Sequence, residues 1–262
     1  MSDALRTWTD FADGDEAIAF FAAPRTLLLD YDGTLSPFVD DPAKAVPYPG
    51  VRSRLAALMK REGTRLVIVT GRASGEGARL LGLEPRPEIW GCHGGERLLP
   101  DGRLIPPDIA SEQQHGLEEA DRIAAALGLA ARLEHKPGCL AFHVRGYPPE
   151  AQAELFAAVR PDWIEVAGRS RLALNDFDGG MELRVEGFNK GDAVRRILAD
   201  TEDGRRVAYL GDDLTDEDAF AALGERGLSV LVRTEPRPTT AALWLRPPEE
   251  LLAFLDRCLD AS

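Results

Sequence analysis

The fold of this chain is decided by one stretch near its N-terminus, Leu27-Leu28-Leu29-Asp30-Tyr31-Asp32-Gly33-Thr34-Leu35. The leucines follow Thr26 in an apolar run that does not alternate with polar residues, which is typical of a strand buried on both faces. Two aspartates and a glycine follow the leucines within four positions. This order predicts a buried strand that ends at a polar site.

Similar apolar runs recur along the chain and predict further buried strands, at residues 65–69, 207–210 and 228–232, with weaker candidates at 89–90 and 242–245. Helical spacing separates them. Val51, Leu55 and Leu58 share one face before Gly63, and another helix is expected to begin near Lys190. Alternating strands and helices predict an α/β core, Rossmann-like, with a parallel sheet flanked by helices.

The middle of the chain has a different pattern. We expect a helix at 111–127, two strands within 131–145 around the turn Pro137-Gly138, and a helix at 149–159. Further strand-like segments lie at 164–166, 171–174 and 181–185. This pattern predicts an inserted α+β cap domain with an antiparallel sheet, spanning 108–187 between core segments 1–107 and 188–262.

Composition excludes several function classes. The chain has 262 residues, with 31 basic and 44 acidic side chains and a net charge of −13, so it repels nucleic acid and anionic membranes. The N-terminus lacks the order of a signal peptide, and no apolar run reaches the length of a membrane span. The three cysteines have no zinc or redox spacing and are expected to be plain thiols. We therefore expect a cytoplasmic, monomeric protein.

Three of the predicted strands end in polar residues, at Asp30, at Thr70-Gly71-Arg72 and at Gly211-Asp212-Asp213. In parallel α/β sheets, ligands bind at the carboxyl ends of the strands. Neighbouring strands would therefore bring these residues to one edge of the sheet.

The aspartates at this edge suit a hard cation. Asp30 and Asp32 can point into one pocket if the chain turns at Gly33, and two close carboxylates need a cation or a shared proton. Asp212 and Asp213 supply further carboxylates, and oxygen ligands of this kind are typical of a Mg²⁺ site. The alternative for Asp30 and Asp32 is a solvated acidic turn.

Two residues can hold a phosphate. Thr70 offers a hydroxyl and nearby amides, although taken alone it is better explained as the N-cap of a helix. Lys190 stands where the helix dipole opposes a cation, which favours neutralisation of a phosphate over a solvated lysine.

The residues after Asp213 have a simpler interpretation. Thr215 can be an N-cap, with Glu217 and Asp218 favouring the first turn of a helix, whereas Asp216 fits either that turn or the site. His93 follows another expected strand end and is either a site contact or a turn residue.

In order, these motifs match those of the haloacid dehalogenase (HAD) superfamily of aspartate-nucleophile phosphotransferases. More narrowly, the chain resembles the trehalose-6-phosphate phosphatase family, through residues 30–37, 69–72 and 211–220. The inserted segment is similar to that family's cap motifs at 133–136, at 140–145 and at Glu182-Leu183-Arg184, and Asn189-Lys190-Gly191 is similar to its Lys-Gly segment.

The resemblance implies a phosphoric monoester hydrolase in which Asp30 attacks phosphorus and forms an aspartyl-phosphate, while Asp32 protonates the leaving sugar and then activates water. It implies a Mg²⁺ site formed by Asp30, the backbone carbonyl of Asp32, and Asp212, with Asp213 orienting waters or ligands. The residues that would bind the substrate sugar phosphate are Thr70, Gly71, Arg72, His93, Glu134, Lys136, Arg145, Glu182 and Lys190.

Rival interpretations remain at this point. A HAD phosphatase for another sugar phosphate, such as glucosyl- or mannosyl-glycerate phosphate, differs only in the cap pocket. A non-catalytic phosphosugar sensor is disfavoured because every catalytic group is present. A structural or interaction protein leaves the acids at the strand ends unexplained.

Overall fold

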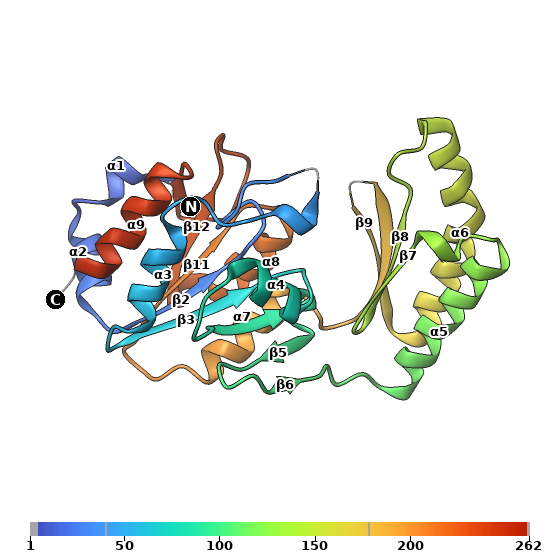
Figure 1. Ribbon diagram of the computed structural model, residues 1–262, viewed down its shortest axis with the longest axis horizontal. Coiled ribbons are helices and arrows are strands. Elements are labelled where there is room, and N and C mark those ends of the chain that lie inside the picture. The colour runs from blue at the N-terminus through green and yellow to red at the C-terminus, as the bar shows by residue number, and fades with distance from the viewer. Residues whose placement is uncertain (1–4, 40, 178, 261–262) are drawn as a thin grey trace. The chain divides into compact units, whose positions relative to one another are not determined.

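A computed structural model describes residues 5–39, 41–177 and 179–260 of the chain (Figure 1). The chain divides into two compact units. The first combines Met1–Ile105 with Asn189–Ser262, and the second is Pro106–Phe188. The second unit is therefore inserted into the sequence of the first.

The first unit is built on a sheet whose described strands have the order β1-β13-β12-β11-β2-β3-β4-β5-β6. Every pairing from β1 to β4 in this order is parallel. β5 is antiparallel to β4, and β6 is antiparallel to β5. The bounds are Arg6–Thr7 (β1), Arg25–Leu29 (β2), Thr64–Val69 (β3), Glu88–Gly91 (β4), Glu96–Leu98 (β5), Leu104–Ile105 (β6), Arg206–Gly211 (β11), Gly227–Val232 (β12) and Leu243–Leu245 (β13).

Helices cover both faces of this sheet. Successive side chains of a strand point to opposite faces, so an apolar strand makes both faces apolar. Leu27 and Leu29 pack in one hydrophobic cluster, and Leu28 packs in another with residues of α7 and α8. The helices are α1 (Trp8–Phe11), α2 (Asp15–Ala22), α3 (Val51–Met59), α4 (Ser74–Leu81), α7 (Lys190–Ala199), α8 (Glu217–Leu223) and α9 (Glu249–Asp260). Short 3-10 turns are η1 (Pro42–Lys44), η2 (Cys92–Gly94), η4 (Leu214–Asp216) and η5 (Gly224–Arg226).

The central strand β2 sets the position of the polar strand ends. Its last residue, Leu29, pairs with Leu210 of β11 on one side and with Ile68 of β3 on the other. This register brings the carboxyl ends of the three strands to the same level of one edge.

The second unit has a separate antiparallel sheet, with the order β7-β8-β10-β9. Two long helices contribute to one hydrophobic cluster with the strands, around Phe142 and Trp163. Its elements are α5 (Ser111–Ala126), η3 (Ala130–Arg132), β7 (Leu133–Lys136), β8 (Cys139–His143), α6 (Pro149–Ser170), β9 (Leu172–Phe177) and β10 (Gly180–Val185).

The predicted fold class is confirmed, but the strand-like segment at 164–166 is wrong. Those residues lie inside α6, which continues through Pro161 to Ser170. The buried residues Val159, Trp163 and Val166 recur at helical spacing, so one helix face enters the core. Pro161 lies on an exposed position of this helix, which is held by tertiary packing.

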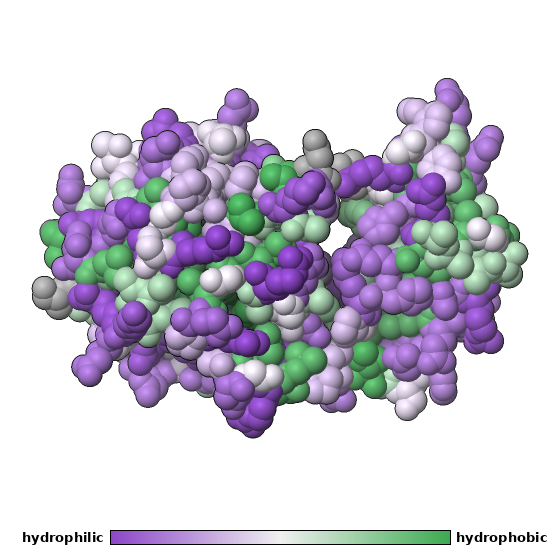
Figure 2. All heavy atoms as spheres, in the orientation of Figure 1, coloured by the Kyte–Doolittle hydropathy of each residue, from purple (hydrophilic) through white to green (hydrophobic). Residues whose placement is uncertain are grey.

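The surface is largely polar on the face that is shown. Figure 2 shows mainly hydrophilic side chains on the visible face, with smaller hydrophobic areas between them. Cys92, Cys139 and Cys258 are all buried, and Cys139 and Cys258 are free thiols, as expected. Among the helices of the described residues, none combines the length and the apolar character that crossing a membrane requires.

Candidate functional site

The site of the first unit lies where β2, β3 and β11 end, and Asp30 is its central residue. Asp30 follows β2 and is 3% exposed. Its Oδ1 accepts a hydrogen bond of 2.7 Å from the Lys190 amine, and its Oδ2 accepts one of 3.1 Å from the Thr34 hydroxyl. Burial, opposed in part by Lys190 and reinforced by Asp216, raises the pKa of Asp30 to about 7.

Lys190 is the first residue of α7, at the helix start where the sequence placed it. The carboxamide of Asn189 caps this helix by accepting from the Asp192 amide. The Lys190 amine is 4% exposed and also donates to Asp216 Oδ1 at 2.7 Å. Two carboxylates therefore compensate this buried cation, and they keep the pKa of Lys190 above its usual value despite burial.

Asp216 is fully buried and uses both of its oxygens. Oδ1 accepts from Lys190 and from the Tyr209 hydroxyl at 2.6 Å, and Oδ2 accepts from the amides of Asp212 and Asp213 at 3.0 Å each. Four donors occupy this carboxylate, so it positions its neighbours. The prediction of Thr215 as an N-cap is wrong, because it lies within η4, whose N-cap is Asp213.

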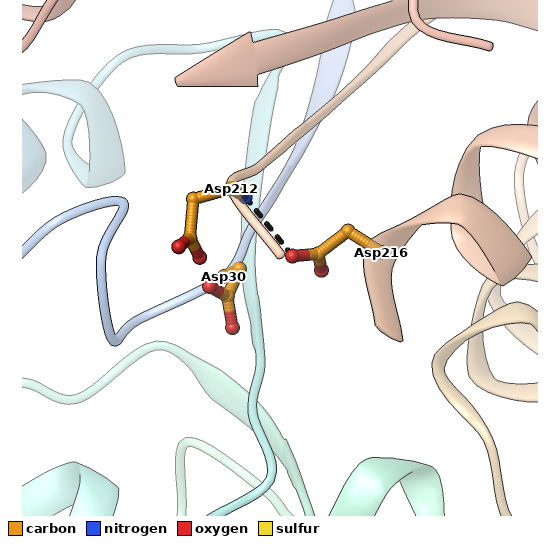
Figure 3. A group of neighbouring side chains, drawn as sticks. All are labelled: Asp30, Asp212 and Asp216. Carbon is orange, nitrogen blue, oxygen red and sulfur yellow. Dashed lines mark hydrogen bonds between the residues drawn. The ribbon is translucent and has the colours of Figure 1, made fainter. Parts of the chain in front are cut away.

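Asp212 contrasts with Asp216. It is 2% exposed, and neither side-chain oxygen has a hydrogen-bond partner. Asp30, Asp212 and Asp216 each offer an oxygen within 4.8 Å of the others (Figure 3). Burial, Asp30 and Asp216 raise the pKa of Asp212 to about 9. Buried orphan oxygens beside a second carboxylate fit a cation site, because a cation would offset both repulsion and desolvation.

Gly33 makes this arrangement possible. It has φ +81°, and a Cβ there would collide with Asp212 Oδ2 and lie 2.7 Å from the Phe38 ring. A glycine is therefore needed for both the left-handed turn and the close approach of Asp212.

Asp32 is held by Arg72. The guanidinium donates from Nε to Oδ2 and from Nη2 to Oδ1 of Asp32, both at 2.7 Å, and from Nη1 to Glu76 at 2.6 Å. This bidentate pair fixes the Asp32 carboxylate, whose side chain remains 31% exposed. Arg72, predicted to bind substrate, thus contacts Asp32 directly.

Thr70, Gly71 and His93 lie together after β3 and β4. The Thr70 hydroxyl accepts a hydrogen bond from the Arg72 amide, and the Thr70 backbone carbonyl accepts one of 2.9 Å from the His93 amide. A Cβ on Gly71 would lie 2.6 Å from the His93 ring. Thr70 is not a helix cap, since α4 begins later at Ser74, whose amide donates to Glu96.

In the second unit, the predicted residues of β7 and β8 form ion pairs on the strands. Glu134 accepts from Lys136 at 3.1 Å and lies 2.9 Å from His143. The ring of His143 stacks edge-on against Phe177, with centroids 5.3 Å apart. Arg145 follows β8 and is exposed.

Glu182 of β10 pairs with Arg184 at 3.3 Å and accepts a weak bond from Cys139. Asn175 of β9 lies opposite Glu182 in the sheet, and its buried Nδ2 has no hydrogen-bond partner. An unsatisfied buried donor beside a carboxylate fits a polar ligand.

The sequence did not single out Tyr209, Asn175 or Arg237. A tyrosine within an apolar strand is a usable signal for Tyr209, because a buried hydroxyl needs a partner. Arg237 lies in a loop that has no motif.

Comparisons with known proteins agree on one family. Residues 28–247 match the model of the trehalose-phosphatase family. A trehalose-phosphate phosphatase of Mycobacterium marinum is 33% identical over 247 residues, which cover 88% of this chain and 60% of that protein. The chain therefore spans less than two thirds of that relative.

Solved structures agree with this match. The trehalose-6-phosphate phosphatase of Aspergillus fumigatus has a TM-score of 0.70 and 26% identity, over 95% of this chain and 98% of that one. A HAD-superfamily phosphatase of Bacteroides thetaiotaomicron, with 18% identity and a TM-score of 0.61 over 90% of this chain and 96% of that one, shares the fold.

Proposed function

Because this chain belongs to the trehalose-phosphatase family, we propose that it hydrolyses trehalose 6-phosphate to trehalose and phosphate. The observation that carries the proposal is the pair of buried carboxylates, Asp30 and Asp212, beside the amine of Lys190. Phosphoryl transfer depends mainly on positioning and charge stabilisation, and this arrangement supplies both.

Asp30 is the proposed nucleophile. Lys190 and Thr34 each hold one of its oxygens, which fixes the direction of the carboxylate. Attack on phosphorus forms an aspartyl-phosphate and releases the sugar oxygen, which takes a proton from Asp32. Lys190 would then lie against the phosphoryl group and offset its charge.

Asp32 is the proposed general acid and base. Its bidentate pairing with Arg72 suits an ionised carboxylate, which is the form that accepts a proton from water when the aspartyl-phosphate is hydrolysed. In the first step Asp32 carries the proton instead, so its bonds to Arg72 must loosen when the substrate phosphate arrives.

We further propose that Mg²⁺ is the cation of this site, held by Asp30, Asp212 and the backbone carbonyl of Asp32, with the exposed Asp213 nearby. Mg²⁺ would neutralise charge on the transferred phosphoryl group. The orphan oxygens of Asp212 support this assignment. Asp216 is not proposed as a ligand, because four donors already occupy it.

We propose that the first unit carries out the chemistry and that the inserted unit selects the sugar. Thr70, Gly71 and His93 would line the phosphate side. Sugar hydroxyls would meet Glu134, Lys136, Arg145 and Glu182, and Asn175 adds a buried donor on the strand next to Glu182.

The test is a phosphate-release assay with Mg²⁺ across trehalose 6-phosphate and other sugar phosphates, including glucosyl- and mannosyl-glycerate phosphate. We expect the highest kcat/KM with trehalose 6-phosphate. Asp30→Asn should lower kcat on the order of 10³-fold or more, since it removes the nucleophile. Asp218→Asn changes an exposed acid of α8 and is the matched control.

The possible outcomes separate the parts of the proposal. Unchanged turnover in Asp30→Asn would rule out the mechanism. A clear preference for another sugar phosphate would overturn the substrate and leave the chemistry intact. Binding of a sugar phosphate without any phosphate release would identify a sensor.

A further inference from the structure

The loop between β12 and β13 contacts the segment that carries Asp212. Arg237 of this loop donates from Nε to the Asp212 carbonyl at 3.2 Å and from Nη2 to the Asp213 carbonyl at 2.7 Å. Arg233 adds a longer bond of 3.4 Å to the Asp212 carbonyl. These bonds join residues more than 20 positions apart, and none belongs to a strand or helix.

The backbone of Asp212 and Asp213 is therefore held from two sides. Asp216 accepts both of their amides, and Arg237 donates to both of their carbonyls. Every backbone polar group of the two residues has a partner. The side chain of Asp212 has none.

Such restraint is needed because the position of Asp212 is unfavourable by itself. Its carboxylate is buried beside that of Asp30, and like charges at this separation repel. Asp213, one residue on, is exposed. Repulsion between the two carboxylates would favour their separation, so the backbone bonds are needed to keep Asp212 close to Asp30.

Arg237 is in turn held by Glu217 of α8. Arg237 Nη1 donates to Glu217 Oε1, and the loop adds bonds to Glu217 from the Thr239 hydroxyl and from the Thr240 amide and hydroxyl. The Arg237 side chain is 15% exposed. Its guanidinium therefore has little freedom to leave the two carbonyls.

We propose that Arg237 is a positioning residue that holds the Asp212 carboxylate in the Mg²⁺ site through the carbonyls of Asp212 and Asp213. This proposal rests on the proposed function, and it assigns a role to a loop that lies outside the sequence motifs described above. Arg237 does not contact the Asp212 carboxylate itself, so it acts on the site through the backbone.

The test measures Mg²⁺ binding by calorimetry with Mg²⁺ alone, on the full chain of wild type, Arg237→Met and Arg237→Lys. We expect Arg237→Met to raise the Kd for Mg²⁺ about 10- to 100-fold, the usual cost of losing a group that orients a metal ligand. Arg237→Lys keeps a cation that can reach one carbonyl, so its Kd for Mg²⁺ should lie between those of wild type and Arg237→Met. At saturating Mg²⁺, KM for trehalose 6-phosphate should match wild type.

Two further variants keep the test decisive. Arg54→Met removes another bidentate pair, with Asp256 of α9, and should leave the Kd unchanged. Glu217→Gln weakens the anchor of Arg237 without removing the arginine, and should raise the Kd by a smaller factor, which covers the case in which Arg237→Met does not fold.

An unchanged Kd in folded Arg237→Met, even with a lower melting temperature, would overturn the proposal, because the arginine would then be structural only. An equal rise of the Kd in Arg54→Met would overturn it as well. Absence of Mg²⁺ binding in wild type would instead refute the proposed magnesium site and everything that rests on it.

Discussion

At the scale of single residues, Asp212 and Asp216 lie four positions apart and have opposite environments. Asp216 receives four hydrogen bonds, whereas the oxygens of Asp212 receive none. A satisfied buried carboxylate organises its surroundings, and an orphaned one needs a ligand. The difference arises because the Lys190 amine, the Tyr209 hydroxyl and two backbone amides donate to Asp216, and none of them donates to the Asp212 carboxylate.

Gly33 offers a sharp prediction at this scale. Gly33→Ala should abolish measurable Mg²⁺ binding and lower kcat at least 10-fold, because the new Cβ would displace the Asp212 carboxylate. A non-glycine residue at positive φ should also cost about 1 kcal/mol of stability. Calorimetry with Mg²⁺ and chemical denaturation measure the two effects.

The matched control is Gly102→Ala. Gly102 has φ +88°, close to that of Gly33, but a Cβ there would meet nothing within 4 Å. It should show the same backbone cost with normal Mg²⁺ binding. Normal Mg²⁺ binding in Gly33→Ala would contradict the close approach of Asp212.

At the scale of elements, the strands of the first unit were predictable because buried runs and strand-end polar residues are local signals. The 164–166 error arose because the β-branched residues Ile164 and Val166 favour a strand locally, while packing of α6 against the core decided otherwise. Helix spacing of Val159, Trp163 and Val166 was the competing signal.

The helices α5 and α6 carry glycines whose replacement should have opposite effects. Gly168 of α6 is exposed, and a Cβ there would meet nothing within 4 Å, so Gly168→Ala should stabilise by about 0.5–1 kcal/mol. Gly116 of α5 is buried, and its Cβ would collide with Ser170, so Gly116→Ala should destabilise by about 1–3 kcal/mol.

Urea denaturation followed by circular dichroism gives both free energies of unfolding. Each alanine gains the same intrinsic helix propensity, so the pair isolates the close contact between α5 and Ser170. Stabilisation by Gly116→Ala would show that this contact can relax without cost.

At the scale of the whole molecule, the buried carboxyl groups of Asp30 and Asp212 make the free energy of unfolding depend on pH and on Mg²⁺. The pKa values of Asp30 and Asp212 are raised to about 7 and about 9, so these two groups hold more protons in the folded chain than in the unfolded one above about pH 4. Without metal, their contribution to the free energy of unfolding should therefore fall as pH rises from about 4 toward 9. A cation opposes this loss, because it favours both ionised carboxylates.

We accordingly expect Mg²⁺ to raise the melting temperature more at pH 8.5 than at pH 5, relative to EDTA. Asp212→Asn removes one buried charge, so in EDTA at pH 8.5 it should melt above wild type and respond little to Mg²⁺. Equal Mg²⁺ shifts at both pH values would contradict this linkage. Differential scanning fluorimetry measures the melting temperature of both proteins under each of these conditions.

The sequence by itself determined the α/β class and the elements that end at Asp30, Thr70 and Asp212, because burial patterns and strand order are encoded over a few residues. Only the tertiary structure decided which groups those acids meet. Arg72 reaches Asp32 across 40 positions, and Lys190 reaches Asp30 across 160. Such partners depend on packing of whole elements, and a pattern along the chain carries no record of which donor arrives at which oxygen.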